Sequence, residues 1–403
     1  MHSVIEHEKL YGAHHYEPLP VVLTRGEGVY VWDDQGNRYM DMMSAYSAVS
    51  HGHCHPELVN ALTEQAKKLA VVSRAYYTDK LGDFLQKVCE AARQEKALAM
   101  NTGAEAVETA LKAARKWAYT VKKVAENKAE IIACEGNFHG RTIVIVGMST
   151  EPQYRNGFGP FPAGFKLIPY GDADALRKAI TPNTAAFLVE PIQGENGIIV
   201  PPAGYLKECA RICRDNNVLL ICDEIQTGMG RTGKFLASDH DDIHPDAVLL
   251  GKALGGGLLP VSVFLARREV MDVFTPGDHG STFGGNPLAA VVGAKALDIL
   301  FKENLIERAE ELGTYFREKL EKLKSPLISA VRGKGLLIGV EINPRYHSAR
   351  EICLQLLKQG VLSKETHHTV IRFAPPLIIT KEQIDEAIKK FSHVLAQAEA
   401  HVC

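Results

Sequence analysis

Short apolar runs that alternate with helical patterns constrain the fold of this chain most. The runs are rich in valine, isoleucine and leucine, and turn residues separate them from segments with helical periodicity. An unbroken apolar strand is typical of a mostly parallel sheet that helices cover on both faces. The sequence therefore predicts such a sheet, with strands at residues 131–134, 143–146, 185–189, 218–222, 247–250 and 261–265.

The patterning divides the chain into three parts and predicts an α/β fold class. Residues 1–46 contain two strand-like runs around a turn at 33–37, which indicates a hairpin. Residues 47–300 hold the apolar runs and are expected to form a large domain. Residues 301–403 change to charged amphipathic helices, such as 307–323, and predict a small α+β domain that the N-terminal segment joins. The strands expected in that last part lie at residues 336–342 and 370–373.

Composition and charge exclude several classes of protein. Of the 403 residues, 46% are hydrophobic and 23% are charged, which is typical of globular chains and not of disordered ones. The formal net charge of -2 provides no general basic surface for nucleic acid. No run approaches the ~20 apolar residues of a membrane span, and the first residues lack an export signal. The eight cysteines show no disulfide or zinc spacing, so we expect a cytoplasmic protein without a metal site.

Two polar residues stand directly after predicted apolar strands. Asp223 follows the run at 218–222, and Lys252 follows the run at 247–250 and Gly251. Ligands of open α/β sheets bind outside the carboxyl ends of the strands, so this acid and this amine can face one ligand. Desolvation lowers the pKa of a lysine and leaves a neutral amine, which is the nucleophile of Schiff-base chemistry. The alternative is a surface lysine in a glycine-rich turn, and the acid at a second strand end weakens it.

Three further segments carry groups that suit a planar, phosphorylated ligand. Thr102 precedes a helical pattern and can cap it, while Gly103 lets backbone amides approach a phosphate. Phe138 can stack on a ring, and Arg141 offers a bidentate grip on a carboxylate. The loop at residues 281–286 adds hydroxyls beside bare backbone. Each has a plainer alternative: a simple helix cap, a core phenylalanine beside a solvated arginine, and a generic Ser/Gly loop.

Two segments imitate known sites. Residues 228–233 match the pattern G-x-G-x-x-G, but no acid stands at a strand end about 20 residues later, so we do not expect dinucleotide binding. The histidines of the segment 51–55 lie too close in sequence to point into one metal site. A turn before a helix at 57–69 is expected there instead.

Six motifs occur together and in chain order. They are Asn101-Thr102-Gly103, Phe138-His139-Gly140-Arg141, Glu190-Pro191-Ile192-Gln193-Gly194-Glu195, Asp223-Glu224-Ile225-Gln226-Thr227-Gly228, Gly251-Lys252-Ala253 and Ser281-Thr282-Phe283. This set resembles the class III, fold-type I pyridoxal-phosphate aminotransferases over essentially the whole chain. The resemblance implies pyridoxal 5'-phosphate as cofactor and a homodimer with shared active sites. Within the class, the motifs at 11–16, 44–49 and 371–376 are similar to those of enzymes that act on ornithine.

The resemblance also implies roles for the residues around the cofactor. Lys252 would form the covalent link to the cofactor and carry a proton, and Asp223 would pair with the pyridine nitrogen. Phe138 would stack on the ring, and Gln226 would donate a hydrogen bond to the phenolic oxygen. The phosphate would be held by Thr102, Gly103, Ala104, Ser281 and, from a partner subunit, Thr282.

The implied reaction transfers the δ-amino group of L-ornithine to 2-oxoglutarate by a ping-pong mechanism and gives glutamate 5-semialdehyde and glutamate. Tyr16 and Arg141 would bind the α-amino and α-carboxylate end of ornithine, in a pocket that Tyr46 lines. Arg372 would bind the α-carboxylate of 2-oxoglutarate or glutamate, and Glu195 would mask it while ornithine reacts. The alternatives are a class III enzyme for acetylornithine or 4-aminobutyrate, a dehydrogenase, and a scaffold without catalysis.

Overall fold

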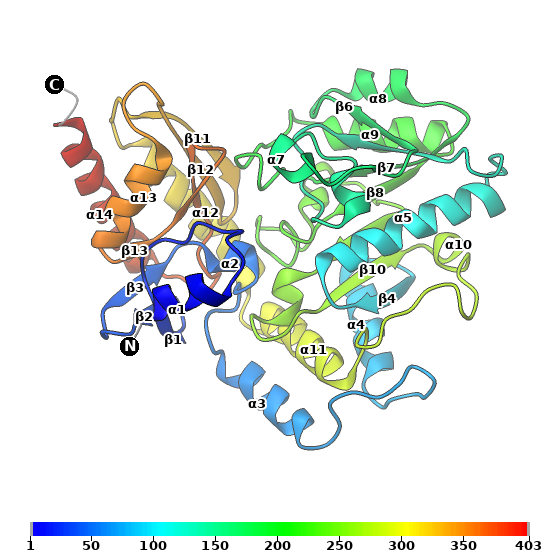
Figure 1. Ribbon diagram of the computed structural model, residues 1–403, viewed down its shortest axis with the longest axis horizontal. Helices are drawn as coiled ribbons and strands as arrows, with labels where there is room; N and C mark the ends of the chain where they lie inside the picture. The colour runs from blue at the N-terminus through cyan, green and yellow to red at the C-terminus, as the bar shows by residue number, and fades with distance from the viewer. Residues whose placement is uncertain (1–2, 401–403) are drawn as a thin grey trace.

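A seven-stranded sheet forms the centre of the structure, which is a computed structural model that describes residues 3–400 (Figure 1). Its strand order is β4-β10-β9-β8-β7-β5-β6. The strand β10 runs antiparallel to both of its neighbours, and every other neighbouring pair is parallel. The expected mostly parallel sheet is therefore confirmed. Its strands are β4 (Lys96–Met100), β5 (Glu130–Cys134), β6 (Phe165–Ile168), β7 (Thr184–Val189), β8 (Leu219–Asp223), β9 (Ala247–Leu250) and β10 (Ser262–Ala266).

Helices cover both faces of this sheet because each strand is apolar on both sides. Ile131 and Ala133 of β5 pack with α5, while Ile132 and Cys134 face α8 and α9. The helices α4 and α11 pack on β9 and β10, on the same face as α8 and α9. No helix within residues 3–400 is long and apolar enough to cross a membrane. The helices of this part include α3 (Pro56–Ala66), α4 (Leu81–Ala92), α5 (Gly103–Thr120), α7 (Pro152–Arg155), α8 (Ala173–Ala179), α9 (Tyr205–Asp215), α10 (Arg268–Met271) and α11 (Pro287–Lys302).

The two ends of the chain form a second, smaller part with two sheets (Figure 1). The predicted N-terminal hairpin is present as the antiparallel pair β2 and β3, and β13 from the C-terminal region adds to β3 in parallel. The second sheet has the order β11-β12-β15-β14. The elements are α1 (Val4–Tyr11), β1 (Leu23–Glu27), β2 (Tyr30–Asp33), β3 (Arg38–Asp41), α12 (Leu305–Glu321), β11 (Ile328–Lys334), β12 (Leu337–Ile342), α13 (Ala349–Lys358), β13 (Val361–Leu362), β14 (Lys364–Thr366), β15 (Val370–Phe373) and α14 (Lys381–Glu399).

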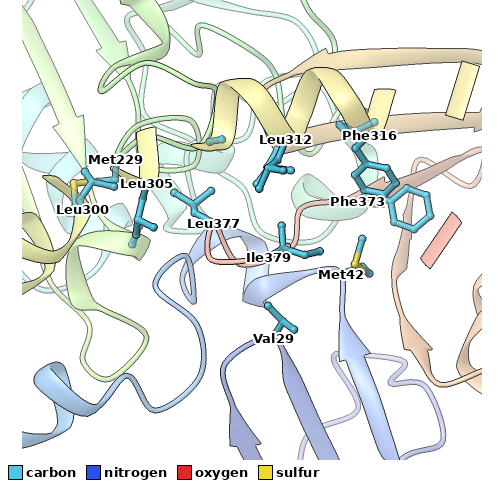
Figure 2. Packing of buried hydrophobic residues seen from close by; sticks show 14 of the residues in the cluster. Val29, Met42, Met229, Leu300, Leu305, Leu312, Phe316, Phe373, Leu377 and Ile379 are labelled. Carbon is cyan, nitrogen blue, oxygen red and sulfur yellow. The ribbon is translucent and has the colours of Figure 1, made fainter. Parts of the chain in front are cut away.

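One apolar cluster continues from the larger part into the smaller one. Figure 2 shows Met229 and Leu300 beside Leu305, with Leu377 and Met42 farther along the same cluster. Burial of such side chains contributes roughly 1.5–3 kcal/mol each. The parts are therefore joined by packing, while the division into 1–46, 47–300 and 301–403 stays a prediction. Residues 1–2 and 401–403 of that division lie outside the described residues.

The run at residues 143–146 is helical, so the strand predicted there is wrong. It forms the single-turn helix α6 (Ile143–Val146), and the Thr142 side chain accepts a hydrogen bond from the backbone amide of Ile145. Ile145 and Val146 are buried, whereas Ile143 is 52% exposed. Four β-branched residues fit a strand or a helical turn equally well by pattern, and the cap decides between them.

Candidate active site

A cavity of about 190 Å³ lies at the carboxyl edge of the large sheet. The ends of five strands supply its walls, in agreement with the rule for ligand sites in open α/β sheets. Six of the predicted residues line it together: Gly103, Ala104, Phe138, Asp223, Gln226 and Lys252. The other lining residues are His139, Gly140, Glu190, Ile192, Ile225 and Thr227.

Lys252 opens the short 3₁₀ helix η2 (Lys252–Gly255) directly beyond β9. Its backbone φ is 44°, in the left-handed region that a non-glycine residue seldom adopts. Such strain persists where the surrounding structure fixes it, and it occurs preferentially at functional sites. Burial lowers the pKa of the Lys252 amine, although the Glu195 carboxylate opposes the shift. The amine is thereby more available in its neutral form.

Asp223 ends β8 and is held by a histidine. The ring Nδ1 of His139 donates to Asp223 Oδ2 at 2.7 Å, since a carboxylate only accepts, and the backbone amide of Ile225 donates to Oδ1 at 3.1 Å. Burial lowers the pKa of His139, but the hydrogen bond and the charge of Asp223 outweigh burial, so the pKa is raised. His139 therefore orients the Asp223 carboxylate and supports its negative charge. The role of this histidine was not predicted from the sequence, although it stands next to Phe138 in a motif.

Glu190 is a second buried carboxyl near this pair. The backbone amide of Phe138 donates to Glu190 Oε2 at 3.0 Å, which connects the carboxyl to the predicted stacking residue. Burial raises the pKa of Glu190 to about 7, and the nearby His139 opposes this shift. Sequence reasoning placed Glu190 in a motif and gave it no role.

We expect Glu190→Gln to change how stability depends on pH. Between its unfolded pKa of 4.5 and about 7, folded Glu190 keeps a proton that the unfolded chain releases. Its stability contribution is thus complete below pH 4.5 and is lost as the pH rises through about 7. The urea midpoint of the wild type should fall between about pH 5 and about pH 7.5. The fall should be smaller in Glu190→Gln, by the equivalent of about 2–3 kcal/mol in the free energy of unfolding. Exposed Glu64→Gln is the control, and equal falls in Glu190→Gln and wild type would contradict the expectation.

Arg372 and Glu195 form an ion pair beside Gln226. Arg372 Nη2 donates to Glu195 Oε1 and to the Gly194 carbonyl, both at 2.9 Å, and Gln226 Nε2 donates to Glu195 Oε1 at 3.2 Å. Burial alone would raise the pKa of Glu195, but the charges of Arg372 and Lys252 hold it at about 2. Gly194 has to be glycine, because a Cβ there would lie 1.7 Å from Gln226 Oε1. The structure therefore brings together the predicted pair and shows it closed.

Arg372 retains unused hydrogen-bonding capacity in this closed arrangement. Its Nε and Nη1 are buried and have no partner among the described residues. Buried N–H groups without hydrogen-bond partners are energetically unfavourable, so Nε and Nη1 of Arg372 favour an additional anionic ligand. The arginine can thus bind a carboxylate when Glu195 moves away.

Arg141 lies close to two aromatic rings, those of Phe138 and Tyr154. Its guanidinium carbon is 5.7 Å from the centre of the Phe138 ring and 4.1 Å from that of Tyr154. Within residues 3–400, no carboxylate forms a salt bridge with Arg141. Arg141 therefore presents an open cation, while Arg372 is masked. The contact of Tyr154 with Arg141 was not predicted from the sequence.

Tyr46 belongs to a strained turn, the short element α2 (Ser44–Ser47). All four residues have positive φ values, from 41° to 77°, and this left-handed conformation costs roughly 1–2 kcal/mol per residue. The turn places the Tyr46 ring 5.3 Å from the guanidinium carbon of Arg372. Tyr16 is 58% exposed, and its nearest ring is that of His15, so the structure does not bring it to the cavity. The substrate role of Tyr16 stays a prediction.

The predicted phosphate residues lie in two places. The amides of Gly103 and Ala104 begin α5, whose N-terminus carries partial positive charge. Thr102 caps that helix through a capping box with Glu105. Ser281 accepts from the Asn101 side chain at 2.9 Å, but Ser281 and Thr282 line a separate cavity of about 960 Å³. Their phosphate contacts therefore stay predictions, including the contact of Thr282 across a dimer interface.

The histidines at 51, 53 and 55 contact three different partners, so they do not meet at one metal site. His51 Nε2 bonds the carbonyl of Ala296 at 2.9 Å, His53 pairs with Asp41 at 2.8 Å, and His55 pairs with Glu303 at 3.1 Å. The segment thus connects α3 and its surroundings to the rest of the fold.

Residues 11–395 match the family model described as aminotransferase class-III. The chain belongs to the class-III aminotransferases. It is 58% identical over 396 residues to the ornithine aminotransferase of Bacillus subtilis (strain 168), an alignment that covers 98% of each chain. It is 46% identical to the ornithine aminotransferase of Toxoplasma gondii, with a TM-score of 0.97 and coverage of 98% of this chain and 94% of that one. An acetylornithine aminotransferase from Elizabethkingia anophelis is 51% identical, with a TM-score of 0.89 and 98% coverage of both chains.

The family cofactor, pyridoxal phosphate, fits the cavity of this class-III aminotransferase. The fold-type I architecture is confirmed by these structures, and the Toxoplasma gondii enzyme holds the cofactor at partial occupancy in its active site. The donor set matches its groups: the Lys252 amine, the Asp223 carboxylate, the Phe138 ring and the first amides of α5. Gly103 also packs tightly in the cavity wall, because a Cβ there would meet the Ile225 side chain at 3.0 Å.

Proposed function

We propose that this class-III aminotransferase transfers the δ-amino group of L-ornithine to 2-oxoglutarate and gives glutamate 5-semialdehyde and glutamate by a ping-pong mechanism. The observation that carries the proposal is the contrast between its two arginines. Arg372 is paired with Glu195 at 2.9 Å, whereas Arg141 lies over the rings of Phe138 and Tyr154 and has no carboxylate partner within residues 3–400. Full-length relatives that are ornithine aminotransferases support the same reaction.

Bound pyridoxal phosphate supplies an electron sink for negative charge at the reacting substrate carbon. Lys252 is proposed to hold the cofactor and to carry a proton on Nζ, for which its lowered pKa suits it. Asp223, oriented by His139, is proposed to keep a proton on the ring nitrogen. Phe138 would cover the ring, and Gln226, which lines the cavity and donates to Glu195, would donate to the phenolic oxygen of the cofactor. The amides of Gly103 and Ala104, with Thr102, Ser281 and the partner's Thr282, are proposed to hold the phosphate.

Two arginines that can each bind a carboxylate, Arg141 and Arg372, explain how one site accepts two substrates. With Arg372 masked, Arg141 is the strong grip for the ornithine α-carboxylate, and Tyr16 is proposed to assist it. Ornithine would then place its δ-amine at the end of the cavity where Lys252 would hold the cofactor. 2-Oxoglutarate requires Arg372 for its α-carboxylate, so Glu195 has to release it in that half-reaction.

We expect Glu195→Ala to weaken the discrimination between the two amines of ornithine. The variant should bind cofactor normally, react with glutamate with a kcat/KM about tenfold higher, and form some product through the α-amine of ornithine. Product analysis and single half-reactions measure these changes. Glu341→Ala is the matched control, since Glu341 pairs with Arg332 at 2.5 Å in the same small sheet. If semialdehyde remains the sole ornithine product and the glutamate kinetics match wild type, the gating role is wrong.

An acetylornithine substrate is the second candidate, because a relative with that activity is 51% identical to this chain. The two differ at the α-amino end, where acetylation removes the charge of the amine. Rates with ornithine, acetylornithine and 4-aminobutyrate, together with trapping of the aldehyde product, separate the candidates. A kcat/KM at least tenfold higher for ornithine supports the proposal, and a preference for acetylornithine overturns it.

We also propose that the chain works as a homodimer in the cytoplasm. Exposed apolar side chains near the Thr282 cavity, including Val71, Tyr76, Tyr77 and Phe283, support a partner surface. The seven described cysteines are free, which supports a reducing compartment. Sedimentation of the purified protein tests the dimer.

A further inference from the structure

Arg231 is a fully buried cation outside the cavity. It lies in the loop that follows Asp223 and Gln226, and its side chain is 0% exposed. Within residues 3–400, no carboxylate forms a salt bridge with it, and burial lowers its pKa to about 9, although Asp41 opposes the shift. A buried charge without a counter-ion is costly, so its hydrogen bonds have to compensate.

The guanidinium of Arg231 binds four oxygens from both ends of the chain. Nη1 donates to the Pro375 carbonyl at 2.6 Å and to the Leu336 carbonyl at 3.0 Å. Nη2 donates to Ser50 Oγ at 2.8 Å and to Ser44 Oγ at 3.2 Å. A planar fork suits this task, because its donors are fixed relative to one another.

Ser44 is the first residue of the left-handed turn that carries Tyr46, and Ser50 lies three residues after the end of that turn. Ser50 Oγ donates to the Ser47 carbonyl at 2.9 Å, and Ser44 Oγ donates to the Ala374 carbonyl at 2.6 Å. Each hydroxyl thus receives one bond from Arg231 and passes another to the backbone. Four consecutive left-handed residues are unfavourable, so the turn depends on such external contacts.

The Pro375 carbonyl, which accepts a hydrogen bond from Arg231, belongs to the chain segment that carries Arg372. Pro375 lies three residues after Arg372, at the exit of β15. The Ala374 amide donates to the Met42 carbonyl at 2.7 Å, which brings this exit beside the start of the turn. One guanidinium therefore fixes the segment of Tyr46 and the segment of Arg372 to the loop of Asp223 and Gln226.

We propose that Arg231 is a positioning residue that holds Tyr46 against Arg372 and thereby sets the affinity of the site for the α-carboxylate of dicarboxylate substrates. The inference rests on the proposed function, because it assigns that carboxylate to Arg372. Arg231 itself touches neither substrate nor cofactor. Its effect passes through the 5.3 Å contact between the Arg372 guanidinium and the Tyr46 ring.

Arg231→Lys tests the inference, since lysine keeps the charge and loses the fork. The probe is glutarate, a dicarboxylate without a reactive amine or ketone, and its binding to the cofactor-loaded protein is measured by calorimetry. We expect the glutarate Kd and the Michaelis constant for 2-oxoglutarate to rise about tenfold, with cofactor absorbance unchanged. Arg115→Lys is the matched control, because Arg115 also donates to a backbone carbonyl, that of Ala163, but lies on α5 and does not contact the turn of Tyr46.

A double-mutant cycle separates positioning from general destabilisation. If Arg231 acts through Tyr46, Arg231→Lys should raise the glutarate Kd less than about twofold in a Tyr46→Ala background. Should Arg231→Lys fail to fold by circular dichroism, Ser50→Ala removes one acceptor of Arg231, and the Kd should rise about threefold. A glutarate Kd at the wild-type value in the folded variant, or a full tenfold effect in the Tyr46→Ala background, overturns the inference alone. Wild-type protein that binds neither glutarate nor 2-oxoglutarate overturns the proposed function as well.

Discussion

Lys252→Ala should abolish transamination, with a loss of at least about 10⁴-fold in kcat/KM. Lys252 is the only lysine among the described residues that line the 190 Å³ cavity, so no second amine can replace it. Burial lowers its pKa, and it lies at the end of β9 opposite Asp223, which terminates the neighbouring strand β8. Steady-state rates with ornithine and 2-oxoglutarate measure the loss.

Lys122→Ala is the matched control for this variant. Burial also lowers the pKa of Lys122, but its amine donates to the Thr184 carbonyl at 2.7 Å and does not line the cavity. The control should retain the wild-type rate. Borohydride reduction of the wild-type protein should attach the cofactor to Lys252, and a label on another lysine would overturn the assignment.

Asp223→Asn should slow the reaction by roughly a thousandfold, or about 4 kcal/mol in the barrier. A neutral amide cannot stabilise a proton on the cofactor ring, so the electron sink weakens. His139 would also lose the charge that raises its pKa. The variant should fold and should still take up cofactor, which absorbance measures separately from turnover.

Asp246→Asn is the control for the acid. Asp246 accepts from the Leu220 amide at 2.8 Å and precedes β9, at the opposite edge of the same sheet. It should change stability and leave turnover within about twofold of wild type. A turnover of Asp223→Asn close to the parental value would show that the carboxylate has no part in the chemistry.

The strands of the large sheet could be predicted where they are nearly continuous apolar runs. The buried strands β7 and β8 are apolar apart from Thr184 at the start of β7 and Asp223 at the end of β8, which is typical of strands covered on both faces. β4 was not predicted, because its lysine, alanine, leucine and methionine favour helices by propensity. The run at 143–146 was assigned to the wrong class, because the Thr142 cap outweighs the β propensity of one short turn.

The strand-end residues of the site could also be predicted, whereas the residues that orient them could not. Asp223 and Lys252 follow apolar strands, and the topology of an open sheet brings such positions together. His139 and Arg231 act through contacts with residues far away in the sequence. The spacing of residues along the sequence gives no signal for contacts of this kind. Residues 228–233 resemble a dinucleotide-binding motif, but what this segment contributes is the buried Arg231.

Nitrogen transfer from ornithine labelled with ¹⁵N at the δ position tests the central claim most directly. Purified protein would receive this ornithine with pyridoxal phosphate and unlabelled 2-oxoglutarate, and the products would be separated and analysed by mass spectrometry. The account predicts that the glutamate carries ¹⁵N and that the carbon product is glutamate 5-semialdehyde without label. Unlabelled glutamate together with a product that retains the ¹⁵N would show transfer of the α-amine and would contradict the account.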